Sequence, residues 1–185
     1  MQLFSHPAFF VVLLVAFVGI LFYVRTYQGR KRGATFPSLF DTPPPQPNVA
    51  LSRRSLEGIG TMEVPSGPEW EREGNAFYNP ALGMSLIIQN QINGFSGREQ
   101  AYLDSYNEVN LRDAPNWERG PEQLGQIAGH VAARTSGRFH NGMEMLTRDY
   151  IFFAPFTTVF FQSRVPAEHA EALALTDYLA STFRR

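Results

Sequence analysis

One stretch near the start of the chain limits what the whole chain can fold into. Residues Ala8 to Val24, AFFVVLLVAFVGILFYV, form a run of 17 residues without a charged side chain. At about 1.5 Å of rise per residue, a helix of this length spans roughly 25 Å, near the lower limit for crossing the hydrocarbon core of a bilayer. We therefore predict a short N-terminus over residues 1–7 and a single transmembrane helix over residues 8–24.

The charges around this run favour a retained, oriented anchor. A cleaved signal peptide carries basic residues before its apolar core, but residues 1–7 contain no Lys or Arg. Basic residues follow the run instead. The positive-inside rule places them, with the large domain, on the cytoplasmic side of the membrane, with the N-terminus outside. We expect a bacterial inner (cytoplasmic or intracytoplasmic) membrane. The basic residues would also bind anionic lipid headgroups. The residues assigned to anchoring and orientation are Phe9, Phe10, Phe17, Phe22, Tyr23, Arg25, Arg30, Lys31 and Arg32.

The Phe side chains of the run leave two kinds of contact open. Phe rings can pack against flat pigments or quinones, and they are also apolar enough to face lipid tails. We favour lipid contact. We expect the chain alone to bind no cofactor, with pigment, quinone or lipid contacts confined to the transmembrane helix.

The composition after the anchor excludes several functions. The chain contains no Cys, which excludes disulfides, thiolate metal sites and Cys nucleophiles. Residues 33–185 carry 12 Arg against 17 Asp and Glu, a formal charge of −5. Because nucleic-acid binding needs a dense basic surface, we expect no nucleic-acid partner.

Residues 25–69 read as a basic juxtamembrane segment followed by a Pro/Gly-rich linker. The sequence PPPQP at residues 43–47 favours an extended polyproline II spacer. Phe36, Leu39 and Phe40 are unusually apolar for a free linker. We therefore predict that these three side chains contact a partner protein.

Residues 70–185 are predicted to form one small α+β domain with an antiparallel sheet and a C-terminal helix. A strand is expected over Met84–Ile92, because an apolar run there ends at an Asn-Gly turn. A hairpin is expected between Tyr150–Phe153 and Thr157–Phe161, two runs rich in aromatic and β-branched residues.

Three helices are predicted in the same domain. The first covers Ser96–Leu111, where a Ser-x-x-Glu capping box opens an apolar pattern of helical spacing. The second covers residues 120–134, although two Gly residues weigh against it and leave a strand open. The third covers Pro166–Phe183, which begins with Pro and is followed by two Arg residues.

The sequence contains no familiar catalytic arrangement. His130, His140 and His169 lack the H-E-x-x-H spacing of a metal site. Lys31 is the only Lys, which excludes a P-loop or Schiff-base Lys in the domain, and no G-x-S-x-G motif is present. We expect a chain that is not an enzyme and holds no metal. An enzyme with a dispersed site ranks third among the functions.

The segment that leaves the membrane resembles a known family. Residues 23–30, YVRTYQGR, with Gly33 and Pro37 after them, are similar to the start of the H subunit of purple-bacterial photosynthetic reaction centres. The resemblance covers about residues 7–37. It implies one span and a Pro-rich linker to a cytoplasmic domain within a photosynthetic membrane complex, and it assigns no site residue.

Two functions follow from these observations. The first is a non-catalytic, single-span accessory subunit that stabilises or caps a larger membrane complex of photosynthetic or respiratory electron transport. Its partners would be integral membrane proteins and the lipid bilayer. The alternative is a stand-alone membrane-anchored ligand-binding or assembly module, with a pocket lined by Phe152, Phe160 and Tyr178.

Overall fold

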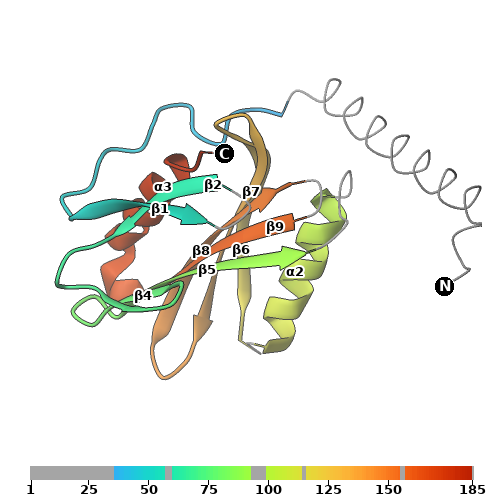
Figure 1. Cartoon of the computed structure of the whole chain (residues 1–185). Coiled ribbons are helices and arrows are strands. Elements are labelled where there is room, and N and C mark those ends of the chain that lie inside the picture. Colours follow the sequence, from blue (N-terminus) through green and yellow to red (C-terminus); the bar gives the residue numbers. More distant parts are fainter. Residues whose placement is uncertain (1–35, 57–59, 93–98, 114–115, 155–156, 185) are drawn as a thin grey trace, which may run out of the picture. The chain divides into compact units, whose positions relative to one another are not determined.

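A seven-stranded sheet, antiparallel throughout, forms the centre of the protein in the computed structural model (Figure 1). The structure describes residues 36–56, 60–92, 99–113, 116–154 and 157–184. The predicted transmembrane run and the basic residues after it lie outside these ranges. No helix within these ranges is long and apolar enough to cross a membrane.

The strands of the sheet are β3 (Glu71–Glu73), β4 (Ala76–Asn79), β5 (Met84–Ile92), β6 (Glu118–Ile127), β7 (His130–His140), β8 (Glu144–Phe153) and β9 (Thr157–Pro166). Their order across the sheet is β3-β4-β5-β9-β8-β7-β6. The predicted strand at β5 is confirmed. The predicted hairpin is confirmed as β8–β9, which closes with a hydrogen bond from Ala154 N to Thr157 O at 2.9 Å.

The central strands β8 and β9 are buried on both faces. Successive side chains of a strand point to opposite faces, yet Ile151 and Phe152 of β8 are both at most 2% exposed. Phe160 and Phe161 of β9 are likewise both buried. Each face of the sheet therefore needs its own cover.

One face is covered by α2 (Glu99–Asp113). Tyr102 and Leu103 of this helix pack against Ile151 and Phe160. The helix predicted here is confirmed from Glu99 onward, whereas the Ser of its capping box lies outside the described residues.

The other face is covered by α3 (Leu173–Ser181) together with a hairpin of β1 (Leu51–Leu56) and β2 (Gly60–Pro65) (Figure 1). Met62 and Val64 of β2 are 0% and 3% exposed. The prediction of a linker was wrong for this hairpin. A two-stranded hairpin is hardly stable alone, but this one is stabilised by packing on the sheet, which the local sequence does not reveal.

The apolar residues at the start of the described chain pack on its own domain. Leu39 is 4% exposed, and its N–H donates to Gln126 O at 3.0 Å at the end of β6. The Phe40 ring lies 5.8 Å from the Tyr150 ring, and Phe36 is half-buried. These contacts within the chain explain why Phe36, Leu39 and Phe40 are apolar, the observation from which we predicted contact with a partner protein.

The helix predicted over residues 120–134 was wrong, because this region forms the β6–β7 hairpin. Ala128 and Gly129 at its turn have φ of 49° and 79°, the left-handed values of a two-residue hairpin turn. Leu124 packs on the α2 side of the sheet and Ile127 on the α3 side. Residues that fit one face of a helix are therefore divided between two faces of a sheet.

The predicted C-terminal helix is present but begins later. Residues Ala167–Ala172 form the 3-10 helix η2, and the α-helix α3 covers only Leu173–Ser181. Phe183 is buried, at 1% exposed, whereas Tyr178 is only half-buried.

We expect a fragment of residues 36–185 to unfold cooperatively and a fragment of residues 70–185 not to fold. The shorter fragment lacks Leu39, Met62 and Val64, which are buried in the core. Truncating a buried Leu or Met to Ala alone costs about 2–5 kcal/mol, and a domain is stable by only about 5–15 kcal/mol. Thermal melts followed by circular dichroism measure both. A cooperative melt of residues 70–185 would contradict the assignment of the hairpin to the core.

Candidate functional site

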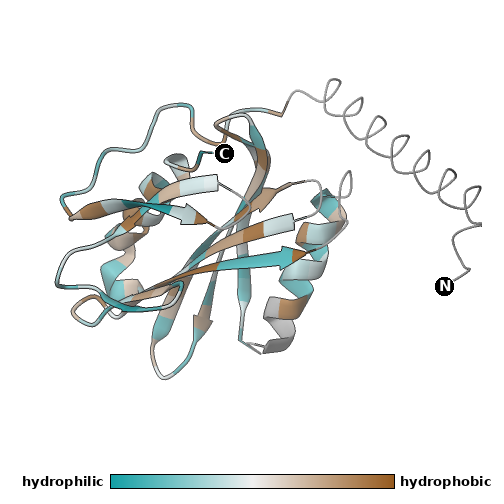
Figure 2. Cartoon of the chain, in the orientation of Figure 1, coloured by the Kyte–Doolittle hydropathy of each residue, from teal (hydrophilic) through white to brown (hydrophobic). Residues whose placement is uncertain are grey.

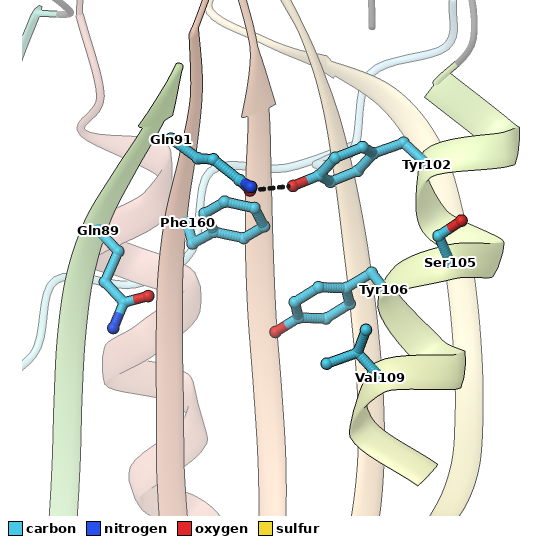
Figure 3. Close-up of a pocket in the computed structure, with 7 residues that line it drawn as sticks. All are labelled: Gln89, Gln91, Tyr102, Ser105, Tyr106, Val109 and Phe160. Atoms are coloured by element: carbon cyan, nitrogen blue, oxygen red, sulfur yellow. Dashed lines mark hydrogen bonds between the residues drawn. The ribbon is translucent and has the colours of Figure 1, made fainter. Parts of the chain in front are cut away.

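A groove between α2 and the outer half of β5 is the candidate site (Figure 3). Its volume is about 330 Å³, within the range of small-ligand sites. Figure 3 shows glutamine side chains from β5 on one side and tyrosine rings from α2 on the other, with Phe160 of β9 between them. The lining residues are Gln89, Gln91, Tyr102, Ser105, Tyr106, Val109 and Phe160.

The strand β5 changes character where it reaches the groove. Its first half alternates, with Leu86 and Ile88 buried, whereas residues 89–92 are all exposed. Figure 2 shows the same change from brown to teal along β5. Gln89 and Gln91 point to the α2 side, since they alternate with the inward-facing Ile88. The strand therefore presents amides to the groove.

Two tyrosines of α2 form the opposite wall. The Tyr102 hydroxyl donates to Gln91 Oε1 at 2.8 Å (Figure 3). The Tyr106 ring stacks on Phe160 with ring centroids 5.6 Å apart. Because the two tyrosines are four residues apart, they lie on the same face of the helix. The groove thus has an aromatic wall with hydroxyl groups.

A buried polar network lies beneath Tyr106. The Tyr106 hydroxyl donates to Asp149 Oδ2 at 2.7 Å and accepts from Gln162 Nε2 at 2.6 Å. Asp149 Oδ1 accepts from Arg164 Nη1 at 2.7 Å and from the Ser163 backbone N–H at 3.2 Å. Asp149 is 1% exposed. Because both carboxylate oxygens have donors and a guanidinium is adjacent, the charge is tolerated inside the protein. The network ties α2 to β8 and β9.

Near neutral pH, Tyr102 and Tyr106 stay neutral and Arg164 stays charged. Burial raises the pKa of Tyr102 to about 12. Burial, followed by the Asp149 carboxylate, raises the pKa of Tyr106 above its ordinary value. Burial acts to lower the pKa of Arg164, but Asp149 and Tyr106 together outweigh it and the pKa rises. The tyrosines therefore serve as hydrogen-bond donors rather than as proton-transfer groups.

The groove offers amides, hydroxyls and rings, which are suited to binding a neutral or amphipathic group. Within the ranges that the structure describes, no group of three His, Asp or Glu side chains could hold a metal ion. That the chain is not an enzyme stays a prediction.

The pocket predicted from Phe152, Phe160 and Tyr178 is not formed. Phe160 faces α2, whereas Phe152 faces the opposite side, where its ring lies 4.2 Å from the Phe183 ring. Tyr178 belongs to α3, which covers that opposite side. Strand alternation separates side chains that the sequence places close together. The signal for the actual groove is the loss of apolar alternation in the second half of β5.

We expect Asp149→Ala to lower the free energy of unfolding by about 3–5 kcal/mol, because it leaves the Arg164 charge in a mostly buried position without its partner. The matched control is Glu118→Ala, which breaks an ion pair with Arg138 whose side chains are 62% and 56% exposed. This control should change stability little. Urea unfolding measures both variants. Equal effects would contradict the structural role assigned to the network.

Alkaline pH should destabilise the domain through its buried tyrosines. The folded-state pKa of Tyr106 lies above the unfolded value near 10, so from about pH 10 upward the unfolded state releases a proton that the folded state keeps. The contribution of Tyr106 to the free energy of unfolding is constant below pH 10 and falls as the pH rises further. Tyr106→Phe should lower stability at neutral pH and flatten the alkaline decline. Unfolding curves measured from pH 8 to pH 12 test this, and an unchanged slope in the variant would contradict it.

The comparisons with known proteins concern the fold. No protein-family model and no curated protein matches the sequence. The chain is similar to the solved structure of LpqN, involved in cell envelope biogenesis of Mycobacterium tuberculosis, with a TM-score of 0.51 and 11% identity over 75% of this chain and 93% of that one. This similarity supports the α+β fold alone.

Two further structures match less closely. CyanoP, the cyanobacterial PsbP of Synechocystis, has a TM-score of 0.49 and 12% identity over 76% of this chain and 96% of that one. The Ran-binding protein Mog1p of Saccharomyces cerevisiae has a TM-score of 0.46 and 15% identity over 73% of this chain and 88% of that one.

Proposed function

We propose that this chain is a non-catalytic accessory protein held at a bacterial membrane by residues 8–24. Its α+β domain caps a larger complex of photosynthetic or respiratory electron transport and contacts it through the groove between α2 and β5. The observation that carries the proposal is the groove itself, an uncharged surface of aromatic rings and amides fixed in place by a buried, fully bonded carboxylate.

The composition of the groove suits a protein partner. Tyrosine is enriched at protein interfaces because it combines a large apolar ring with a hydrogen-bonding end. Here Tyr102 and Tyr106 are held by Gln91 and Asp149, so binding costs little side-chain entropy. Ser105 and Val109 are exposed at the edge of the same surface, and Val109 is 44% exposed.

A second candidate is a stand-alone anchored module that binds a small ligand. The observation in its favour is the size of the groove, about 330 Å³, which suits a small molecule. Its ligand would be flat, with polar atoms at one edge to meet the amides of Gln89 and Gln91.

The proposal is tested by filling the groove. Ser105→Trp places a large ring in it, whereas Gln100→Trp adds the same ring at an exposed position of α2 outside the groove. After mild-detergent solubilisation of native membranes, the unaltered chain and Gln100→Trp should migrate in a large coloured particle. Ser105→Trp should raise the free fraction about tenfold. Size analysis and an absorption spectrum measure this.

If the unaltered chain migrates alone and colourless, the accessory function is wrong and the ligand-binding module takes its place. If Ser105→Trp and Gln100→Trp behave alike inside the particle, the groove is not the contact surface.

A further inference from the structure

The outer half of β5 is paired along one edge only. Toward β9, the ladder continues to the pair Ile92↔Thr157. Toward β4, the ladder ends at the pair Ala76↔Ile87, and one more hydrogen bond follows, from Ile88 N to Asn75 O at 3.0 Å. Beyond Ile88, no strand among the described residues pairs with this edge.

Alternation decides which backbone groups face the open edge. The N–H of Ile88 points toward β4, and in an antiparallel ladder every second residue directs its N–H and C=O to the same side. Asn90 and Ile92 therefore direct their backbone groups to the open edge. Gln89 and Gln91 direct theirs to β9.

Residues 89–92 contain no Lys or Pro that would block strand pairing at this edge. Proteins block open edges with Lys, Pro or strong twisting bulges, whereas residues 89–92 read Gln-Asn-Gln-Ile. The Ile92 side chain is 89% exposed. The free backbone N–H and C=O groups of an edge strand are a template for another strand, and the exposed Ile92 side chain lies beside them.

A recess lies on each face of this edge. On the α2 face, Gln89 and Gln91 line the aromatic groove. On the opposite face, a polar recess of about 180 Å³ is lined by residues of β1, by Asn75 and by Ile88 and Asn90. Since alternate side chains of a strand point to opposite faces, an added strand would place successive side chains beside two different surfaces.

We propose that the edge formed by residues 89–92 accepts an extended segment of a partner protein as an added strand, hydrogen-bonded to the backbone of Asn90 and Ile92. The residue opposite Ile92 is apolar and the residue opposite Asn90 is polar. The residue between them is aromatic or long and aliphatic, and it reaches the mouth of the groove. This inference rests on the proposed function, since the complex supplies the segment.

The length of the edge favours a partner segment over a second copy of this chain. Four residues span about 13 Å, and stable interfaces between whole proteins bury about 1,200–2,000 Å². A short ladder between two copies falls below that range. A segment of a complex in the same membrane needs a smaller buried area to bind, because anchoring raises its effective concentration.

The experiment places a photo-crosslinking amino acid at Ile92, and separately at Asn90, in the full chain in its native membranes. The control position is Met143, which is 53% exposed in the β7–β8 turn. We expect adducts from both edge positions with one segment of one partner, at partner residues two apart, as strand register requires. Met143 should give at least tenfold less adduct.

A second variant tests the backbone contact. Asn90→Pro removes an N–H that faces the open edge, whereas the bonds to β9 are made by the neighbouring residues. It should lower the adduct yield from position 92 at least tenfold, with a thermal midpoint close to that of the unaltered chain.

Any of four outcomes would overturn the proposal. The adduct yields could equal that of Met143, or the adducts could lack the two-residue register. The adducts could also form only with lipid, or only with a second copy of this chain. Co-migration with a large complex could still be observed in any of these cases, so failure of the added strand is distinguishable from failure of the accessory function.

Discussion

Burial of β8 and β9 on both faces is the constraint on which the rest of the structure depends. Four consecutive residues of β8, from Tyr150 to Phe153, are each at most 6% exposed. An antiparallel sheet can leave one face in water, but this one cannot. The chain therefore supplies α2 for one face and α3 with the β1–β2 hairpin for the other.

Each helical cover has a hydrogen bond to the sheet through a carboxylate, which is buried on the α2 face and half-buried on the other. On the α2 face, Asp149 of β8 receives the Tyr106 hydroxyl. On the opposite face, Asp177 of α3 receives the Tyr150 hydroxyl at 2.6 Å and Arg148 at 2.5 Å. Hydrophobic packing is non-directional, whereas a charge-assisted bond has a fixed geometry. These two contacts add a directional constraint to the apolar packing of each helix on the sheet.

The elements predicted correctly are those whose pattern is local. The β8–β9 hairpin and α2 follow from aromatic runs and helical spacing that need no distant partner. The β1–β2 hairpin was missed because its stability comes from packing on the sheet, far away in the chain. The strand β6 was missed because its apolar residues also fit one face of a helix. Gly125, which weighs against a helix, has a packing reason: a Cβ there would lie 2.6 Å from Pro37 O and 2.9 Å from the Leu39 side chain.

The candidate groove could not be predicted from the sequence, because its walls come from three separate elements, β5, α2 and β9. Yet its polarity has a local origin. The second half of β5 is exposed. A run of apolar side chains there would promote aggregation through strand pairing. Gln and Asn both donate and accept hydrogen bonds, so they keep the strand soluble and still able to pair. A strand of this kind is solvated when alone and complementary to another backbone when one is present, and Ile92 adds the apolar contact that makes such pairing favourable.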